Sequence, residues 1–323
     1  MDINRNIGLT NPNASKECIR LMQYLKEISG KGIIAGQHTQ TREQKELQHI
    51  QNLTGKLPAI CGFELLGYSP NINYNDASEE CLIEVRENVG TLENAMDWAL
   101  NKKGIVTFTW HWFSPLGGRD KSFYAKNTDF DATKVLIEGS PEQSAFFSDM
   151  DCIARELKKF EQKSIPILWR PFHEADGTWF WWGSKGPEVA KELWNLMYDR
   201  YTHYHHLNNL IWVWNSHLPS GYPGDDTVDI ISRDIYLEKY THTDFSEQYY
   251  ELIQITSAKK LAALGEVGTM PSASQLEKTR IPWCWFMIWS NEFCLTEQWT
   301  KNDELCKAYQ SSYVITLDKL PNL

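Results

Sequence analysis

The chain has 323 residues, of which 32 are Lys or Arg and 42 are Asp or Glu, so its formal net charge is −10. This acidic balance argues against nucleic acid or an anionic membrane as a partner, because both attract a net basic surface. The longest apolar runs, such as residues 281–289, are far shorter than the roughly 18 residues that a membrane-spanning helix requires. The composition is that of a packed soluble protein.

The N-terminal segment leaves the cellular compartment open. Residues 1–10 are polar and lack the apolar core of a signal peptide. Taken literally, this beginning predicts a cytoplasmic protein. A sequence that starts after a removed signal would look the same, which would make the protein a secreted one.

Short β-type runs alternate with helical stretches along the chain, and no linker rich in Pro, Gly or Ser divides it. The first elements expected are a helix, two strands, a helical region and a third strand, at 13–29, 32–37, 58–63, 79–101 and 104–110. A long loop to about residue 141 leads to helix 142–162, strand 165–172, helix 187–205, strands 210–214 and 228–236, helix 246–257, strands 260–265 and 283–289, and a closing helix near 303–312.

This alternation predicts an α/β protein whose eight parallel strands close into a (β/α)8 TIM barrel, as a single domain over residues 1–323. The rival doubly wound fold normally carries a glycine-rich phosphate-binding turn after an early strand. Neither G-x-G-x-x-G nor G-x-x-x-x-G-K-[ST] occurs. The barrel is therefore the favoured fold.

Tryptophan is the compositional outlier, because 14 Trp accompany 14 Tyr and 13 Phe. Eleven of the 14 lie in predicted strands or just after them, near the barrel end where active sites are built. Some of these must be core. Trp179, Trp181 and Trp182 lie beyond a strand end, where packing alone does not readily explain three indoles. They are candidate platforms for flat, polar-rimmed ligands such as sugar rings.

Two glutamates end predicted strands that face each other across the barrel mouth. Glu174 closes the fourth strand in Trp-Arg-Pro-Phe-His-Glu, and Glu266 closes the seventh in Ala-Leu-Gly-Glu-Val-Gly. One such glutamate alone is most simply a helix cap or a salt-bridge partner. Two of them in a Trp-lined mouth indicate glycoside hydrolysis, in which a pair of carboxylates flanks the bond that is cleaved.

Strand alternation assigns inward-facing neighbours to these residues. Phe172 and Arg170 are expected to share the face of Glu174, and Leu264 and Ala262 the face of Glu266. Three further inward sets are expected on strands 6, 8 and 3: Ser232, Asp234 and Tyr236; Trp285, Met287 and Trp289; Thr107, Thr109 and His111. An inward Arg170 would be costly to bury without a carboxylate partner.

Other motifs in the sequence give weaker indications of function. His203, His205 and His206 suggest a metal site, but they lie at a predicted helix C-terminus, where cationic side chains suit the helix dipole. The motif after His173 is not H-E-x-x-H, and no G-x-S-x-G is present, which argues against a zinc peptidase and a serine esterase.

The block Trp-Arg-Pro-Phe-His-Glu-Ala-Asp-Gly-Thr-Trp-Phe-Trp-Trp-Gly (169–183) resembles glycoside hydrolase family 26, whose best-known members are endo-β-1,4-mannanases. The likeness extends over essentially the whole chain, to Thr-Trp-His-Trp (109–112), Asp-Ile-Tyr (234–236), Gly-Glu-Val-Gly (265–268) and Ile-Trp-Ser (288–290). That family belongs to a clan of retaining (β/α)8 glycosidases with the acid/base on strand 4 and the nucleophile on strand 7.

The resemblance implies a role for each residue that matches its motifs. Glu174 becomes the acid/base and Glu266 the nucleophile, whose carboxyl groups should lie about 5–5.5 Å apart. His173 takes the place that an Asn fills in much of the clan, close to the nucleophile and the sugar 2-hydroxyl. Independently of the resemblance, Arg170 is the expected positive neighbour of the nucleophile, because an ionised carboxylate needs one.

The same resemblance supplies the supporting side chains. Tyr236 would hydrogen-bond the nucleophile, and Asp234 would steady the acid/base side. His111 and Trp289 would line the sugar subsite at the cleavage point, with Trp179 on the leaving-group side.

The expected activity is retaining endo-hydrolysis of mannan, glucomannan or galactomannan, by a monomer without metal or cofactor. The alternatives are the same mechanism on mixed-linkage β-glucan or xylan, exo-acting release of mannobiose, and a non-catalytic sugar-binding barrel. The sequence departs from the family in the loop 114–122 and at Glu64, where Asp is expected. Loops of this kind set the number of subsites, so the endo or exo mode stays open.

Overall fold

The computed structural model describes residues 7–116 and 122–323. Most of the loop 114–122 and the start of the polar N-terminal segment lie outside the described residues. Within the described ranges, no helix is both long enough and apolar enough to cross a membrane.

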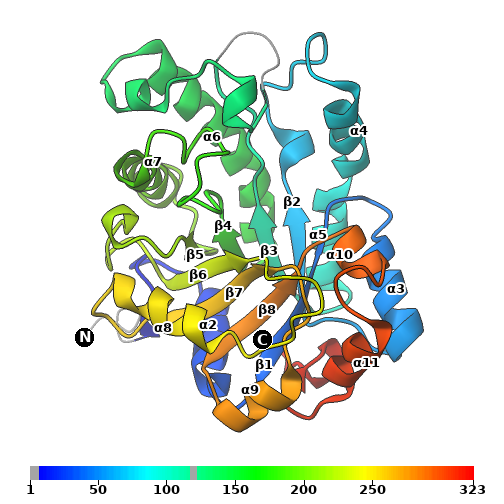
Figure 1. Cartoon of the computed structure of the whole chain (residues 1–323). Helices are drawn as coiled ribbons and strands as arrows, with labels where there is room; N and C mark the ends of the chain where they lie inside the picture. Colours follow the sequence, from blue (N-terminus) through cyan, green and yellow to red (C-terminus); the bar gives the residue numbers. More distant parts are fainter. Residues whose placement is uncertain (1–6, 117–121) are drawn as a thin grey trace.

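Eight parallel strands close into a barrel (Figure 1). They are β1 (Ile33–Thr39), β2 (Ile60–Glu64), β3 (Ile105–Thr109), β4 (Ile167–Arg170), β5 (Leu210–Asn215), β6 (Ile230–Ile235), β7 (Leu261–Val267) and β8 (Trp283–Ile288). Each strand pairs with the next, and β1 pairs with both β2 and β8, which closes the ring. The predicted (β/α)8 fold is confirmed. A short strand, β9 (Val314–Ile315), adds to β1.

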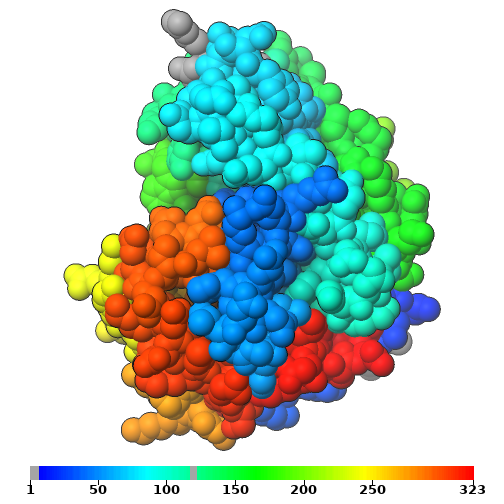
Figure 2. Space-filling view, turned by 90° about the vertical axis from the view of Figure 1, so that its right-hand side faces the viewer, coloured from blue at the N-terminus to red at the C-terminus, as the bar shows by residue number. Residues whose placement is uncertain are grey.

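Helices between the strands form the outer layer. They are α3 (Lys45–Thr54), α4 (Glu79–Asn88), α5 (Thr91–Leu100), α6 (Pro141–Glu161), α7 (Pro187–Asp199), α8 (Ser246–Leu252), α9 (Ala273–Thr279), α10 (Glu292–Leu295) and α11 (Asn302–Gln310). Helix α3 packs against α10 and α11, so segments from the two ends of the sequence lie side by side on the face shown in Figure 2.

Helix α2 (Lys16–Ile28) covers the amino-terminal end of the barrel. The Cys18 thiol contacts the carbonyl of Asn208, just before β5, at 3.7 Å. The Cys284 thiol of β8 contacts the carbonyl of Leu25 at 4.0 Å. Because this end is closed by a helix, the barrel is open to ligands at the carboxyl ends of its strands, as in other barrels of this type.

Two features of the outer layer differ from the sequence prediction. Helix α3 was not expected, because its segment buries few apolar side chains, chiefly Leu47 and Ile50. The single helical region predicted at 79–101 is two helices, α4 and α5. Gly90 separates them with a φ of 101°, a left-handed conformation that favours glycine and that no helix interior allows.

Candidate active site

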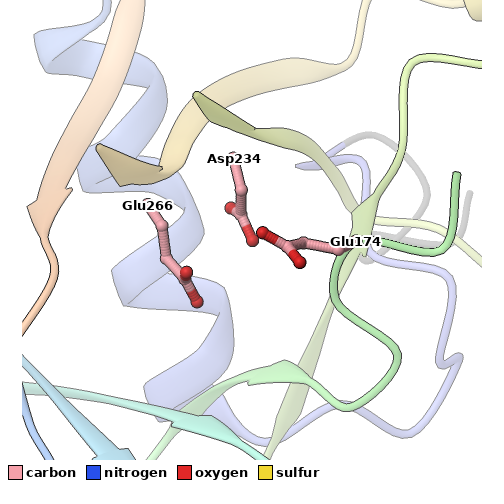
Figure 3. Close-up of side chains that lie close together, drawn as sticks. All are labelled: Glu174, Asp234 and Glu266. Carbon is pink, nitrogen blue, oxygen red and sulfur yellow. The ribbon is translucent and has the colours of Figure 1, made fainter. Parts of the chain in front are cut away.

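Three carboxylates converge at the mouth of the barrel (Figure 3). Glu266 lies in β7 and Asp234 in β6, whereas Glu174 lies in the turn that follows β4. One oxygen of each carboxylate lies within 4.8 Å of the others. The structure thus brings together the two glutamates that the sequence singled out, with Asp234, expected on the acid/base side, beside them.

A β-bulge directs Glu266 into the mouth. The register of β6 against β7 shifts by one residue, from Arg233 opposite Leu264 to Asp234 opposite Glu266. Gly265 faces the same interior, because a Cβ on it would lie only 2.5 Å from Asp234 Oδ1. The expectation that Leu264 and Ala262 share the face of Glu266 is therefore wrong, and both pack in the core between strands and helices.

Glu174 reaches the mouth through a left-handed turn rather than through strand alternation. Its φ is 51°, and its backbone N–H donates to Asn215 Oδ1 at 2.6 Å. Strand β4 already ends at Arg170, so alternation does not extend to Phe172. Phe172 instead stacks near Phe146 of α6, outside the barrel, which corrects its expected inward position.

Arg170 connects two of the three carboxylates. Its guanidinium donates to Asp234 Oδ2 at 2.6 Å and to Glu266 Oε1, and all three side chains are almost fully buried. Tyr236 donates its hydroxyl to Glu266 Oε2 at 2.8 Å. The partners expected for Arg170 and Glu266 are thus in place, and they hold both oxygens of Glu266.

The site contains more negative than positive charge. Burial, aided by the nearby Asp234 carboxylate, raises the pKa of Glu174 to about 7. Burial also raises the pKa of Asp234 and of Glu266, and Arg170 opposes that rise. Because the Arg170 guanidinium contacts only two of the three neighbouring carboxylates, the group retains a proton near neutral pH. Glu174, which does not contact Arg170, is the best placed to carry it.

Three carboxylates this close are also sufficient in number to ligate a divalent cation. In this site, however, Arg170 already occupies one oxygen of Asp234 and one of Glu266. Trp179 Nε1 and Tyr236 Oη occupy oxygens of Glu174 and Glu266. The donors match an organic acid–base site better than a metal site.

The pKa of Glu174 predicts the alkaline limb of the pH profile. A general acid must be protonated, and a pKa raised to about 7 keeps Glu174 protonated below that pH. If the site catalyses glycoside hydrolysis, we expect kcat/KM to fall above about pH 7, approaching tenfold per pH unit. An alkaline limb that persists unchanged in Glu174→Gln would contradict this assignment.

Most of the tryptophans at the mouth are core. Nine of the eleven indoles near the strand ends are buried. Trp181 and Trp182, expected as ligand platforms, are fully buried, and their N–H groups donate to the carbonyls of Trp112 and His173. Trp179 is 49% exposed and donates to Glu174 Oε2 at 2.5 Å. It is the member of this trio that a ligand can reach.

Trp289 follows β8 and is half-buried on the other side of the mouth. Its ring stacks on the imidazole of His38 with 4.1 Å between centroids, and it lies 5.9 Å from the ring of His111. Trp289 and His111 therefore lie close together at the mouth, and their role in a sugar subsite stays a prediction.

Trp289→Ala tests this platform. If the ring supports the sugar at the cleavage point, kcat/KM should fall at least tenfold, about 1.4 kcal/mol of transition-state stabilisation. The melting temperature should change little, because the ring is half-buried against a single stacking partner. Loss of thermal stability with activity kept per folded molecule would identify Trp289 as core instead.

A second polar cluster surrounds His111 and His173. The Nε2 atoms of these two imidazoles lie 3.1 Å apart, and His111 Nδ1 lies 2.7 Å from Glu64 Oε2. Glu64, the departure from the family pattern, is thus placed directly behind the His111 ring.

The sequence reading missed Asn215 and His38. Both are polar residues near the carboxyl ends of strands, Asn215 in β5 and His38 in β1. That position alone could have marked them as candidate site residues. Among the described residues, His203, His205 and His206 do not belong to a group of potential metal ligands. His205 instead pairs with Asp151, whose two oxygens also accept hydrogen bonds from Arg200.

Known proteins resemble this chain over almost its whole length. A family model described as Glycosyl hydrolase family 26 matches residues 10–319. A "Mannan endo-1,4-beta-mannosidase" of Thermothelomyces thermophilus is 39% identical over 326 residues, which cover 98% of this chain and 64% of that protein. The "Mannan endo-1,4-beta-mannosidase A" of Piromyces sp is 32% identical and covers 98% of this chain and 51% of that protein. The chain therefore spans between half and two thirds of the length of these curated relatives.

Solved structures agree with this result. The Podospora anserina GH26-CBM35 β-(1,4)-mannanase superposes with a TM-score of 0.87 at 39% identity, covering 96% of this chain and 68% of that chain. A β-mannanase from a symbiotic protist of the termite Reticulitermes speratus, complexed with gluco-manno-oligosaccharide, gives a TM-score of 0.86 at 30% identity over 98% of both chains.

Proposed function

The chain belongs to glycosyl hydrolase family 26, and from this premise we propose that it hydrolyses internal β-1,4-mannosidic bonds with retention of configuration. The substrates proposed are mannan, glucomannan and galactomannan. The observation that carries the proposal is the pair Glu174 and Glu266, whose oxygens approach within 4.8 Å in a mouth flanked by accessible indoles.

The two glutamates have the environments that a double displacement needs. Glu266 is held by Arg170 and Tyr236, which stabilise its ionised form and leave it facing the mouth. Glu174 retains a proton near neutral pH and accepts a hydrogen bond from the exposed Trp179. These settings support Glu266 as the nucleophile and Glu174 as the acid/base.

The reaction then proceeds in two steps. Glu266 attacks the anomeric carbon while Glu174 protonates the leaving oxygen, which breaks the glycosidic bond and leaves a glycosyl ester on Glu266. Glu174, now ionised, removes a proton from a water molecule, whose oxygen displaces Glu266 from the anomeric carbon. The product is released and both glutamates return to their starting protonation states.

The carboxylate spacing supports retention. Inverting glycosidases keep their two carboxyl groups roughly 6.5–9.5 Å apart to admit a water molecule, whereas retaining ones need about 5–5.5 Å. Oxygens that approach within 4.8 Å suit the shorter arrangement. We expect ¹H NMR of a fresh digest to show the β-anomer as the first product. An α-configured first product would exclude the double displacement.

The substrate is tested by a reducing-sugar assay on mannan, barley β-glucan and xylan. We expect release from mannan to exceed that from the other two by at least tenfold. Preference for glucan or xylan would reassign the substrate, and release of mannobiose alone would indicate an exo mode. Binding of mannan without hydrolysis would identify a sugar-binding barrel.

A further inference from the structure

The carboxylate of Glu64 is buried at the end of β2, and none of the steps above uses it. It accepts four hydrogen bonds. Its Oε1 receives the backbone N–H groups of Leu65 and His111 at 2.8 and 2.7 Å. Its Oε2 receives the Thr109 hydroxyl and His111 Nδ1, both at 2.7 Å. Three of these contacts, from the backbone N–H groups of Leu65 and His111 and from the Thr109 hydroxyl, have a fixed direction and reach both oxygens, and the pKa of Glu64 is lowered to about 2, so the carboxyl group is ionised at neutral pH.

This arrangement restricts the protonation of the two imidazoles. Because Glu64 Oε2 can only accept, His111 Nδ1 carries a hydrogen. The contact of 3.1 Å between His111 Nε2 and His173 Nε2 then allows two states. Either His111 is neutral and His173 donates, or His111 is an imidazolium and donates to His173. In the second state the hydrogen of His173 is on Nδ1, for which the described residues supply no hydrogen-bond partner.

The charges around His111 favour the imidazolium. Four carboxylates face it: Glu64 of β2, Glu84 of α4, Glu174 of the turn after β4, and Glu266 of β7. Of its neighbours, the His38 and His173 rings are buried with lowered pKa values and stay neutral, and the cation of β4, Arg170, is bound to Asp234 and Glu266.

We propose, resting on the function proposed above, that Glu64 is a positioning residue: it holds His111 as a buried imidazolium that donates to His173 and so fixes the turn carrying Glu174. Burial acts to lower the pKa of His111, but the Glu64 carboxylate, together with the more distant Glu266 and Glu174, opposes it and the pKa is raised. In return, His111 overcomes the burial of Glu64 and lowers its pKa to about 2.

The turn is then held at three points. The imidazole of His173 is bound by His111, the carbonyl of His173 accepts from Trp182 Nε1 at 2.9 Å, and the backbone N–H of Glu174 is bound by Asn215. Fixing is needed here because a left-handed glutamate is strained and would relax if released. The imidazolium also adds a second positive charge beside the carboxylates, and it lowers the pKa of Glu174.

The test begins with the unmodified protein. ¹⁵N-labelled histidine, with His111 identified by the signal lost in His111→Gln, reports both ring nitrogens by NMR. We expect both His111 nitrogens to carry hydrogen at pH 7, and His173 to carry its hydrogen on Nδ1. A neutral His111 at pH 7 in the unmodified protein would overturn the proposal, whatever the activity. This readout is independent of whether mannan is the substrate.

Variants then separate positioning from folding. In Glu64→Gln, His111 should become neutral at pH 7, and the alkaline limb of kcat/KM should move up by about half a pH unit or more as Glu174 loses a neighbouring cation. Glu64→Asp keeps the charge and should restore the imidazolium. A residue with only a structural role would lower activity without moving the limb, and that result would refute the proposal.

Glu84→Gln is the matched control. It also removes a carboxylate that faces His111, but Glu84 makes no hydrogen bond to that ring among the described residues. We expect His111 to stay protonated at pH 7 in this variant. If His111 also loses its charge in Glu84→Gln, then the summed negative charge of the carboxylates around the mouth, rather than Glu64 itself, keeps His111 protonated. If Glu64→Gln fails to fold, the protonation state of His111 at pH 7 in the unmodified protein and in Glu64→Asp tests the proposal instead.

Discussion

Glu266→Ala is expected to abolish turnover on every substrate, with kcat/KM reduced at least a thousandfold, about 4 kcal/mol. No leaving group can substitute for a missing nucleophile, so activated aryl mannosides should be as unreactive as mannan. The fold should survive, because Arg170 keeps Asp234 as its partner and a crowded negative charge is removed. Initial rates and melting temperature measure both effects.

Azide reports which step Glu266 performs. In Glu266→Ala the small cavity admits azide, which should attack the anomeric carbon directly and yield an α-mannosyl azide. Tyr236→Phe is the matched control, because it removes a hydrogen bond to Glu266 but keeps the nucleophile, and it should give no azide product. A pre-steady-state burst of phenol from Glu266→Ala would be incompatible with Glu266 as the nucleophile.

Glu174→Ala is expected to separate substrates by leaving group. Hydrolysis of mannan should fall at least a thousandfold, about 4 kcal/mol, because an alkoxide cannot leave unprotonated. An aryl mannoside with a nitrophenol leaving group should still form the glycosyl-enzyme, since that phenol leaves without a proton. The intermediate should then accumulate as a burst, because no base remains to activate water.

Azide should restore turnover of Glu174→Ala, since it attacks the intermediate without base help. Two successive inversions then give a β-mannosyl azide, opposite to the product of Glu266→Ala. Asp176→Asn is the matched control, because Asp176 lies in the same turn but pairs with His217 at 2.5 Å. It should show neither burst nor azide rescue. An α-azide from Glu174→Ala would reverse the two roles.

The sequence predicted the barrel because its strands are short, apolar and evenly separated by helices. It also placed Glu174 and Glu266 at the correct end of the barrel, because residues at the carboxyl ends of barrel strands lie at the mouth. Helix α3 was missed because its few apolar residues give a weak pattern.

Alternation failed where the backbone leaves regular strand geometry. The shift at Gly265 changes the parity of β7 by one residue, so Leu264 points outward although Glu266 points inward. The left-handed φ of Glu174 has no marker in its side chain, since glutamate rarely adopts it. The three indoles Trp179, Trp181 and Trp182 looked equivalent in the sequence, yet the fold buries two and exposes one, because burial depends on partners from the segment after β3 and the turn after β4.

The conformation of Glu174 has a consequence for selecting improved variants. A left-handed non-glycine residue costs about 1 kcal/mol relative to glycine, and its carboxylate is crowded by two others. Replacing Glu174 with glycine relieves both costs at once. A library ranked by heat resistance alone is therefore expected to enrich Glu174→Gly, which lacks the proposed acid/base, and selection for the proposed activity must score sugar release in each round.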